Sequence, residues 1–164
     1  METRRTEKEK ELVAVGASVA AGCVPCTQYH VKAVRSAGAS IEEITHAVDT
    51  ALCIRAGAKS VMAHVAYEAL GLPTQPDSPC CALGDDRVTQ LVSIAAAVAV
   101  NCPSIFQSQI AAGRAAGVSD HDIRLAVALA QMIRAKATEK MDAAAKPTAA
   151  DTPAESPCGC GCAS

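Results

Sequence analysis

The chain has 164 residues, of which 50% are apolar and 2% aromatic, and its formal net charge is −2. This length suits one compact domain or two small fused halves, with a core built from Ala, Val, Ile and Leu. The small negative charge excludes a basic field for nucleic acid, and the scarcity of aromatic side chains removes a stacking platform for bases. We therefore expect no nucleic-acid partner.

Cysteine usage points to redox chemistry. The nine cysteines are odd in number and clustered, whereas a framework of structural disulfides would spread them along the chain. Such clusters in a chain of enzyme size favour thiol redox chemistry or soft-metal binding, and they predict a cytoplasmic protein.

An apolar run from Leu12 to Gly22 precedes Cys23 and resembles a lipoprotein signal. The segment before it carries four acidic and four basic residues, so it lacks the positive charge that such a signal needs. A similar run recurs inside the chain, and neither reaches the ~18 residues of a membrane span. We therefore expect no membrane association.

The sequence repeats itself at an offset of 79 positions. Residues 12–63 align with residues 91–142 without a gap, and 21 of the 52 pairs are identical. The identical pairs include Cys, Gln, Arg, Gly and Ser in one register, which chance similarity between Ala-rich helices would not give. The pattern predicts a tandem duplication.

All the expected elements are helices. In chain order they cover residues 6–21, 25–37, 41–70, 86–100, 103–116 and 119–142. Gly57 is a potential break in the third of them.

Capping residues define these helices. Pro25 suits a first helical turn, and Gly38 is a natural C-cap for the helix that Pro25 opens. Ser40 with Glu43 forms a capping box, and Ser119 copies it as a weaker cap in the second repeat.

The sequence thus predicts an all-α fold with a tandem duplication of one helical unit. The first repeat covers residues 1–70, a Pro/Gly/Ser linker covers 71–85, and the second, degenerate repeat covers 86–142. Residues 143–164 are Ala, Pro, Thr and acidic residues that end in a Cys-rich motif. That composition cannot bury a core, so we expect a disordered Cys-rich tail.

The candidate site is Cys23-Val-Pro-Cys26 with His30 one turn further on. If the helix begins near Pro25, these groups share one face, and Cys26 lies in the first turn, where the helix dipole favours thiolate. An adjacent imidazole can take the thiol proton, and the second thiol can close a disulfide. These are the parts of a reversible two-electron thiol cycle.

The second repeat sharpens this interpretation. At the positions equivalent to Cys23, Cys26 and His30 it has Cys102, Ile105 and Gln109. A site present in one copy only is hard to explain as a need of the scaffold. Two alternatives remain open. Both cysteines could be small buried apolar residues, or the group could bind zinc with Cys53 as the fourth ligand.

Glu11, Cys23-Val-Pro-Cys26-Thr-Gln-Tyr-His30 and the Ala37–Ile44 segment resemble the AhpD-like alkylhydroperoxidase branch of the carboxymuconolactone decarboxylase family. The resemblance implies duplicated helical units that assemble into homo-oligomers, as trimers or hexamers. It also implies that Cys26 is the attacking thiolate, Cys23 the resolving thiol, His30 the base and Glu11 its distant partner. Decarboxylases of the family lack the CxxC pair, so thiol chemistry is expected here.

The chain departs from the better-known members of that branch in two respects. Those members carry a second His between the two cysteines, where this chain has Val24 and Pro25, and this difference argues against strong peroxidase activity. Their active centre lies in the later repeat, whereas the CxxC pair of this chain lies in the first.

The remaining candidates have plainer interpretations. We expect Cys53 and Cys102 to be core residues, and we expect His46 to be partly buried. His64 and His121 are expected on helix surfaces. Four arginines that pair between the repeats are expected to cap helix ends or to bridge subunits, and they are Arg35, Arg55, Arg114 and Arg134.

The motif Cys158-Gly-Cys160-Gly-Cys162 cannot be core packing if the tail is unstructured. Its thiolates suit a soft metal or metalloid such as Cu(I), Zn or As, and the adjacent Cys80 and Cys81 add a second potential soft site. The motif could alternatively serve as a mobile thiol arm for the Cys23–Cys26 disulfide, or have no defined role.

Two functions follow. The first is a thiol-dependent oxidoreductase that reduces a peroxide or exchanges disulfides, with no required cofactor and a dithiol or thioredoxin-like protein as reductant. The second is a soft-metal or metalloid binding protein that uses the C-terminal cysteines.

Overall fold

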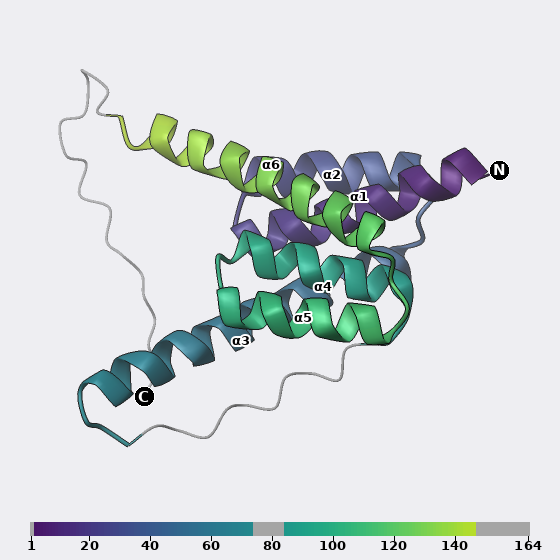
Figure 1. The fold of residues 1–164 in the computed structure, drawn as a ribbon. Coiled ribbons are helices and arrows are strands. Elements are labelled where there is room, and N and C mark those ends of the chain that lie inside the picture. The colour runs from purple at the N-terminus through teal and green to yellow at the C-terminus, as the bar shows by residue number, and fades with distance from the viewer. Residues whose placement is uncertain (1, 74–83, 147–164) are drawn as a thin grey trace.

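The predicted all-α fold is confirmed by a computed structural model, which describes residues 2–73 and 84–146. The described residues form six helices and no strand (Figure 1). In chain order these are α1 (Glu2–Ala21), α2 (Val24–Ser36), α3 (Ile41–Ala69), α4 (Arg87–Ala99), α5 (Pro103–Ala115) and α6 (Asp120–Ala144).

The duplication appears as an approximate two-fold relationship between the repeats. The helices α1, α2 and α3 correspond to α4, α5 and α6, and the central helices α1 and α4 pack directly against each other. Each central helix also packs against the last helix of the other repeat, α1 against α6 and α4 against α3. The two repeats therefore share one core.

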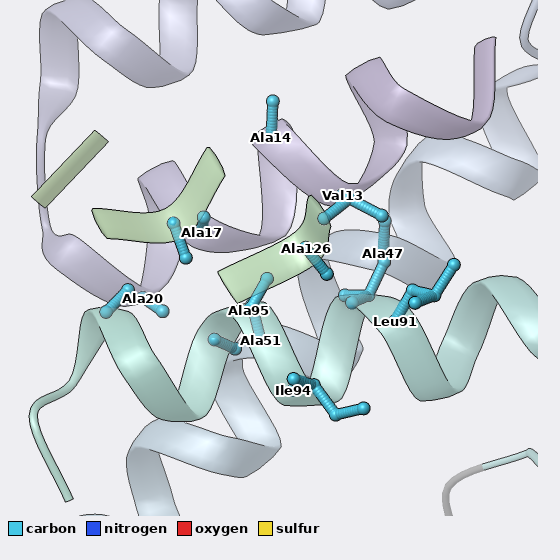
Figure 2. Close-up of a cluster of buried hydrophobic side chains, with 14 of the residues drawn as sticks. Val13, Ala14, Ala17, Ala20, Ala47, Ala51, Leu91, Ile94, Ala95 and Ala126 are labelled. Atoms are coloured by element: carbon cyan, nitrogen blue, oxygen red, sulfur yellow. The ribbon is translucent and has the colours of Figure 1, made fainter. Parts of the chain in front are cut away.

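That core is rich in Ala, as the composition predicts. Figure 2 shows small side chains from α1, α3, α4 and α6 meeting at the centre, among them Ala17, Ala51, Ala95 and Ala126. Small residues let the helix axes approach closely. At Gly16 an added Cβ would lie 2.6 Å from a methyl carbon of Val92, so α1 and α4 are in contact there.

The expected caps are present. The Ser40 side chain accepts the Glu43 N–H and the Glu43 side chain accepts the Ser40 N–H, which completes the capping box. Ser119 accepts the Asp122 N–H in the same way at the start of α6. Gly38 has the positive φ of a helix-terminating residue, at 88°.

The expected break near Gly57 is wrong, because α3 runs unbroken from Ile41 to Ala69. A single Gly costs a helix only about 1 kcal/mol, which the packing of this helix offsets. The missing side chain also makes room for the second repeat, since a Cβ at Gly57 would lie 3.1 Å from Cδ1 of Ile105.

The C-terminal halves of α3 and α6 extend beyond the bundle (Figure 1). No residue of α3 after Ala58, and none of α6 after Ile133, is buried. Apolar side chains such as Met62, Leu70 and Met141 are exposed on these ends. No helix among the described residues is long and apolar enough to cross a membrane.

The expected linker and tail fall largely outside the described residues. Residues 74–83, with Cys80 and Cys81, are not described, and neither are residues 147–164. The expectations of disorder and of metal binding at Cys158, Cys160 and Cys162 therefore remain predictions.

Candidate active site

The CxxC pair lies at the junction between α1 and α2. The first helix ends at Ala21, Gly22 turns the chain with a φ of 69°, and Cys23 is the N-cap of α2. Pro25 falls in the first turn of α2, where its missing N–H needs no partner. The local sequence thus places Cys23 just before the helix and Cys26 within its first turn.

The two cysteines form a disulfide in this structure, with their Cα atoms 5.3 Å apart. Their environments differ. Cys23 is 6% exposed and its Sγ accepts the backbone N–H of Cys26 at 3.3 Å, whereas Cys26 is half-buried. An N-cap position with an N–H directed at the sulfur stabilises a thiolate at Cys23. A reactant from solution meets Cys26 first.

Glu11 and His30 are brought together by the packing of α1 against α2. The Nδ1 atom of His30 lies 2.8 Å from Oε2 of Glu11, whose side chain is buried. With Glu11 as a carboxylate, which only accepts hydrogen bonds, the tautomer that fits this contact has the proton on Nδ1 of His30, and this N–H donates a hydrogen bond to Glu11. This leaves Nε2 of His30 as the proton acceptor of the ring.

A groove of about 670 Å³ lies beside the Cys23–Cys26 disulfide. Cys26, Tyr29 and His30 line it from α2, and the part of α6 between Leu129 and Lys140 forms the other wall. That wall is apolar at Leu129, Met132 and Ile133. The first repeat therefore supplies the thiols and the imidazole, and the second repeat shapes the space in front of them.

The match to known families agrees with this geometry. Residues 4–67 and 84–150 both match the carboxymuconolactone decarboxylase family, one match for each repeat. The chain belongs to the carboxymuconolactone decarboxylase family. This family includes both decarboxylases and alkylhydroperoxidases. Neither a curated protein nor a solved structure matches the chain.

The second carboxymuconolactone decarboxylase repeat keeps the backbone of the site without its chemistry. Cys102 is the N-cap of α5 with φ −112° and ψ 99°, close to the −91° and 96° of Cys23. Ile105 stands in place of Cys26, and Cys102 is a free, buried cysteine. Among the described residues, the α1–α2 junction is therefore the copy that carries a disulfide-bonded cysteine pair.

Gln90 is a site-related residue that sequence reasoning missed. At the offset of 79 it is the counterpart of Glu11, and Gln109 is the counterpart of His30. Gln90 is buried, its amide nitrogen donates to the Gly84 carbonyl, and its Oε1 has no hydrogen-bond partner. Extending the alignment by one residue, at the same offset of 79, pairs Glu11 with Gln90 and would have identified this residue from the sequence.

The other candidates lie away from the groove. Cys53 is buried, as expected, and His64 and His121 are exposed, as expected. The expected partial burial of His46 is wrong. His46 is an exposed residue of α3, and its Nε2 lies 2.8 Å from the hydroxyl of Thr89 in the first turn of α4.

Two of the four paired arginines, Arg55 and Arg134, contact helix ends, whereas Arg114 forms an ion pair with Asp120. Nη1 of Arg55 donates to the carbonyl oxygens of Val19 and Ala20 at the end of α1, at 2.8 and 3.2 Å. Arg134 caps the end of α4 through the Val98 carbonyl. These contacts confirm the expected capping role for this pair.

The zinc alternative finds no support in the described part of the chain. No group of three or more His, Cys, Asp or Glu side chains is arranged there to hold a metal ion. The fourth ligand considered for zinc, Cys53, is buried on α3.

Proposed function

We propose that this protein is a thiol-dependent oxidoreductase in which Cys23 and Cys26 alternate between dithiol and disulfide. The observation that carries the proposal is the joint placement of the disulfide and the hydrogen-bonded Glu11–His30 pair at the start of α2. The cycle needs two thiols, one base and an accessible sulfur, and it requires no bound cofactor.

In the oxidative half of the cycle, His30 takes the thiol proton of Cys26, and the resulting thiolate attacks a peroxide oxygen. The O–O bond breaks, the leaving alkoxide takes the proton that His30 accepted and departs as an alcohol, and Cys26 becomes a sulfenic acid. The Cys23 thiol then attacks this sulfur and releases water as the disulfide forms. Glu11 stabilises the imidazolium that His30 forms on accepting the proton.

In the reductive half, an external dithiol attacks the disulfide. The half-buried position of Cys26 directs the attack to its Sγ, and Cys23 leaves as a thiolate that accepts the Cys26 N–H. The second thiol of the reductant then releases Cys26 and keeps the new disulfide. A disulfide of another protein can replace the peroxide as oxidant, because the same Cys26 thiolate would attack it.

The test is the rate at which the reduced protein consumes an organic hydroperoxide or a protein disulfide in the presence of a dithiol. We expect turnover in the wild type and in Cys102→Ser, which alters the equivalent cysteine of the second repeat. We expect none in Cys26→Ser. The proposal fails if wild type turns over neither substrate, or if Cys26→Ser matches it.

We also propose that the protein works as a homo-oligomer, a trimer or a hexamer. The projecting ends of α3 and α6 expose Met62, Leu70 and Met141 without a partner among the described residues. Burying such side chains between copies would stabilise helical ends that have little packing of their own. Light scattering of the purified protein tests this, and a monomer at all concentrations would overturn it.

A further inference from the structure

The groove beside Cys26 has two features that define what fits it. The apolar part of its lining is open to solvent, since Tyr29 and Met132 are 67% and 66% exposed. Its rim on α6 carries Lys136 and Lys140, together with Glu139. An extended segment that is largely uncharged, with some acidic residues and a thiol, would complement such a groove.

The chain itself continues from the end of this wall. The helix α6 ends at Ala144, and Ile133 in the groove lies eleven residues before that end, about 16 Å along the axis. Eleven residues, 147–157, separate the last described residue from Cys158. At ~3.3 Å per residue they can span up to ~36 Å. The segment is therefore long enough to return along α6 and bring Cys158 to Cys26.

The composition of this segment matches the groove. Residues 147–164 contain Asp151 and Glu155 and no Lys, Arg or His. On the rim, Lys136 is paired with Glu139 at 2.7 Å, so the three side chains leave a net charge of +1, which the acidic segment opposes. The three cysteines Cys158, Cys160 and Cys162 are separated by single glycines. Two of these thiols together can supply the two electrons that one disulfide requires.

We propose that residues 147–164 bind in this groove and reduce the Cys23–Cys26 disulfide by intramolecular exchange. A thiolate of the segment attacks Sγ of Cys26, the Cys23–Cys26 bond breaks, and Cys23 leaves as a thiolate. A second thiol of the segment attacks the mixed disulfide and releases Cys26. Two electrons and two protons pass to the pair, and the segment keeps a disulfide that an external dithiol reduces.

This inference rests on the proposed redox cycle and names its immediate reductant. Tethering matters because a linked thiol acts at an effective concentration in the millimolar range, well above that of a dilute protein reductant.

The first experiment traps the intermediate. In full-length Cys23→Ser the mixed disulfide cannot resolve back to Cys23, and Ser preserves the N-cap. After mild oxidation, peptide mapping under non-reducing conditions should find Cys26 joined to Cys158, Cys160 or Cys162, in a yield that does not depend on protein concentration. Cys26→Ser, which leaves only the buried Cys23, should give no such peptide.

The second experiment measures how fast an external dithiol reduces the Cys23–Cys26 disulfide. Replacing Cys158, Cys160 and Cys162 by Ser should slow the reduction by ~10-fold or more. The control is Cys80→Ser with Cys81→Ser, which should leave the rate unchanged. Charge reversal at Lys136 and Lys140 should lower the yield of the trapped peptide.

The outcomes separate the two proposals. If the triple Ser variant is reduced as fast as the wild type and no trapped peptide forms, the segment is not the reductant, while the redox function of the pair stands. If no dithiol reduces the pair in the wild type, the proposed function fails and this inference fails with it.

Discussion

Nδ1 of His30 lies 2.8 Å from Oε2 of Glu11, although the two residues are 19 positions apart and belong to different helices. The corresponding residues of the second repeat are Gln109 and Gln90, which cannot act as an acid–base pair at neutral pH. Among the described residues, the first repeat therefore carries a hydrogen-bonded Glu–His pair, and the second repeat carries two glutamines at the equivalent positions.

Glu11→Gln should lower kcat/KM for the oxidant by about 10- to 100-fold, within the range that general bases contribute. The amide cannot stabilise the imidazolium and can hold His30 in the wrong tautomer. An unchanged melting temperature would show that the variant still folds. Glu43→Gln, outside the groove, serves as control, and equal rates for both variants would contradict the role of Glu11.

Ile105→Cys should create a second disulfide, between Cys102 and the new cysteine. The backbone at Cys102 already resembles that at Cys23, and Pro103 follows as the first residue of α5. Thiol titration and mass spectrometry would detect the bond. The loss of Ile105 from its contact with Gly57 should cost roughly 1–3 kcal/mol of stability. Two free thiols after oxidation would show that the repeats differ in geometry.

Arg55→Gln should affect both stability and thiol reactivity. The substitution removes a charged donor from two carbonyl oxygens at the end of α1, which should lower the free energy of unfolding by about 1 kcal/mol. These carbonyl groups lie next to the turn that carries Gly22 and Cys23. Arg134→Gln removes the matching cap from α4 and should cost similar stability. Only Arg55→Gln should change the rate at which a dithiol reduces the disulfide. Equal rates for both variants would limit Arg55 to a structural role.

Acid should destabilise the fold through a few carboxylates. The hydrogen bond from Lys8 lowers the pKa of Glu43, and the hydrogen bond from the Ser119 hydroxyl, followed by Arg87, lowers the pKa of Asp122. A folded pKa below the unfolded value contributes stability that is complete above the unfolded pKa and is lost as the pH falls through the folded one.

We therefore expect these carboxylates to leave the free energy of unfolding constant near neutral pH. The free energy of unfolding should decrease as the pH drops below about 4. Urea unfolding at a series of pH values measures it. Glu43→Gln should show a shallower loss in acid because it has no charge to neutralise. A wild-type free energy of unfolding that rises between pH 5 and pH 3 would show that these ion pairs do not govern acid stability.

Much of this protein could be predicted from local signals. Apolar periodicity and caps such as Ser40 define the helices to within a few residues, and the offset of 79 reveals the duplication. The placement of Cys26 in the first turn of α2 also follows from local sequence, because Pro25 and Gly22 fix where that helix begins. These features depend on residues that are neighbours along the chain.

Other features depended on contacts between distant segments. Helical periodicity could not place Glu11 beside His30, since their contact depends on how α1 packs against α2. The same applies to the groove wall at Met132, which the second repeat supplies through the two-fold packing of α1 and α4. The cysteines and the histidine of the candidate site could thus be identified from neighbouring residues along the chain. The residue that orients His30 and the wall that faces Cys26 could not, because both depend on the packing of helices distant in sequence.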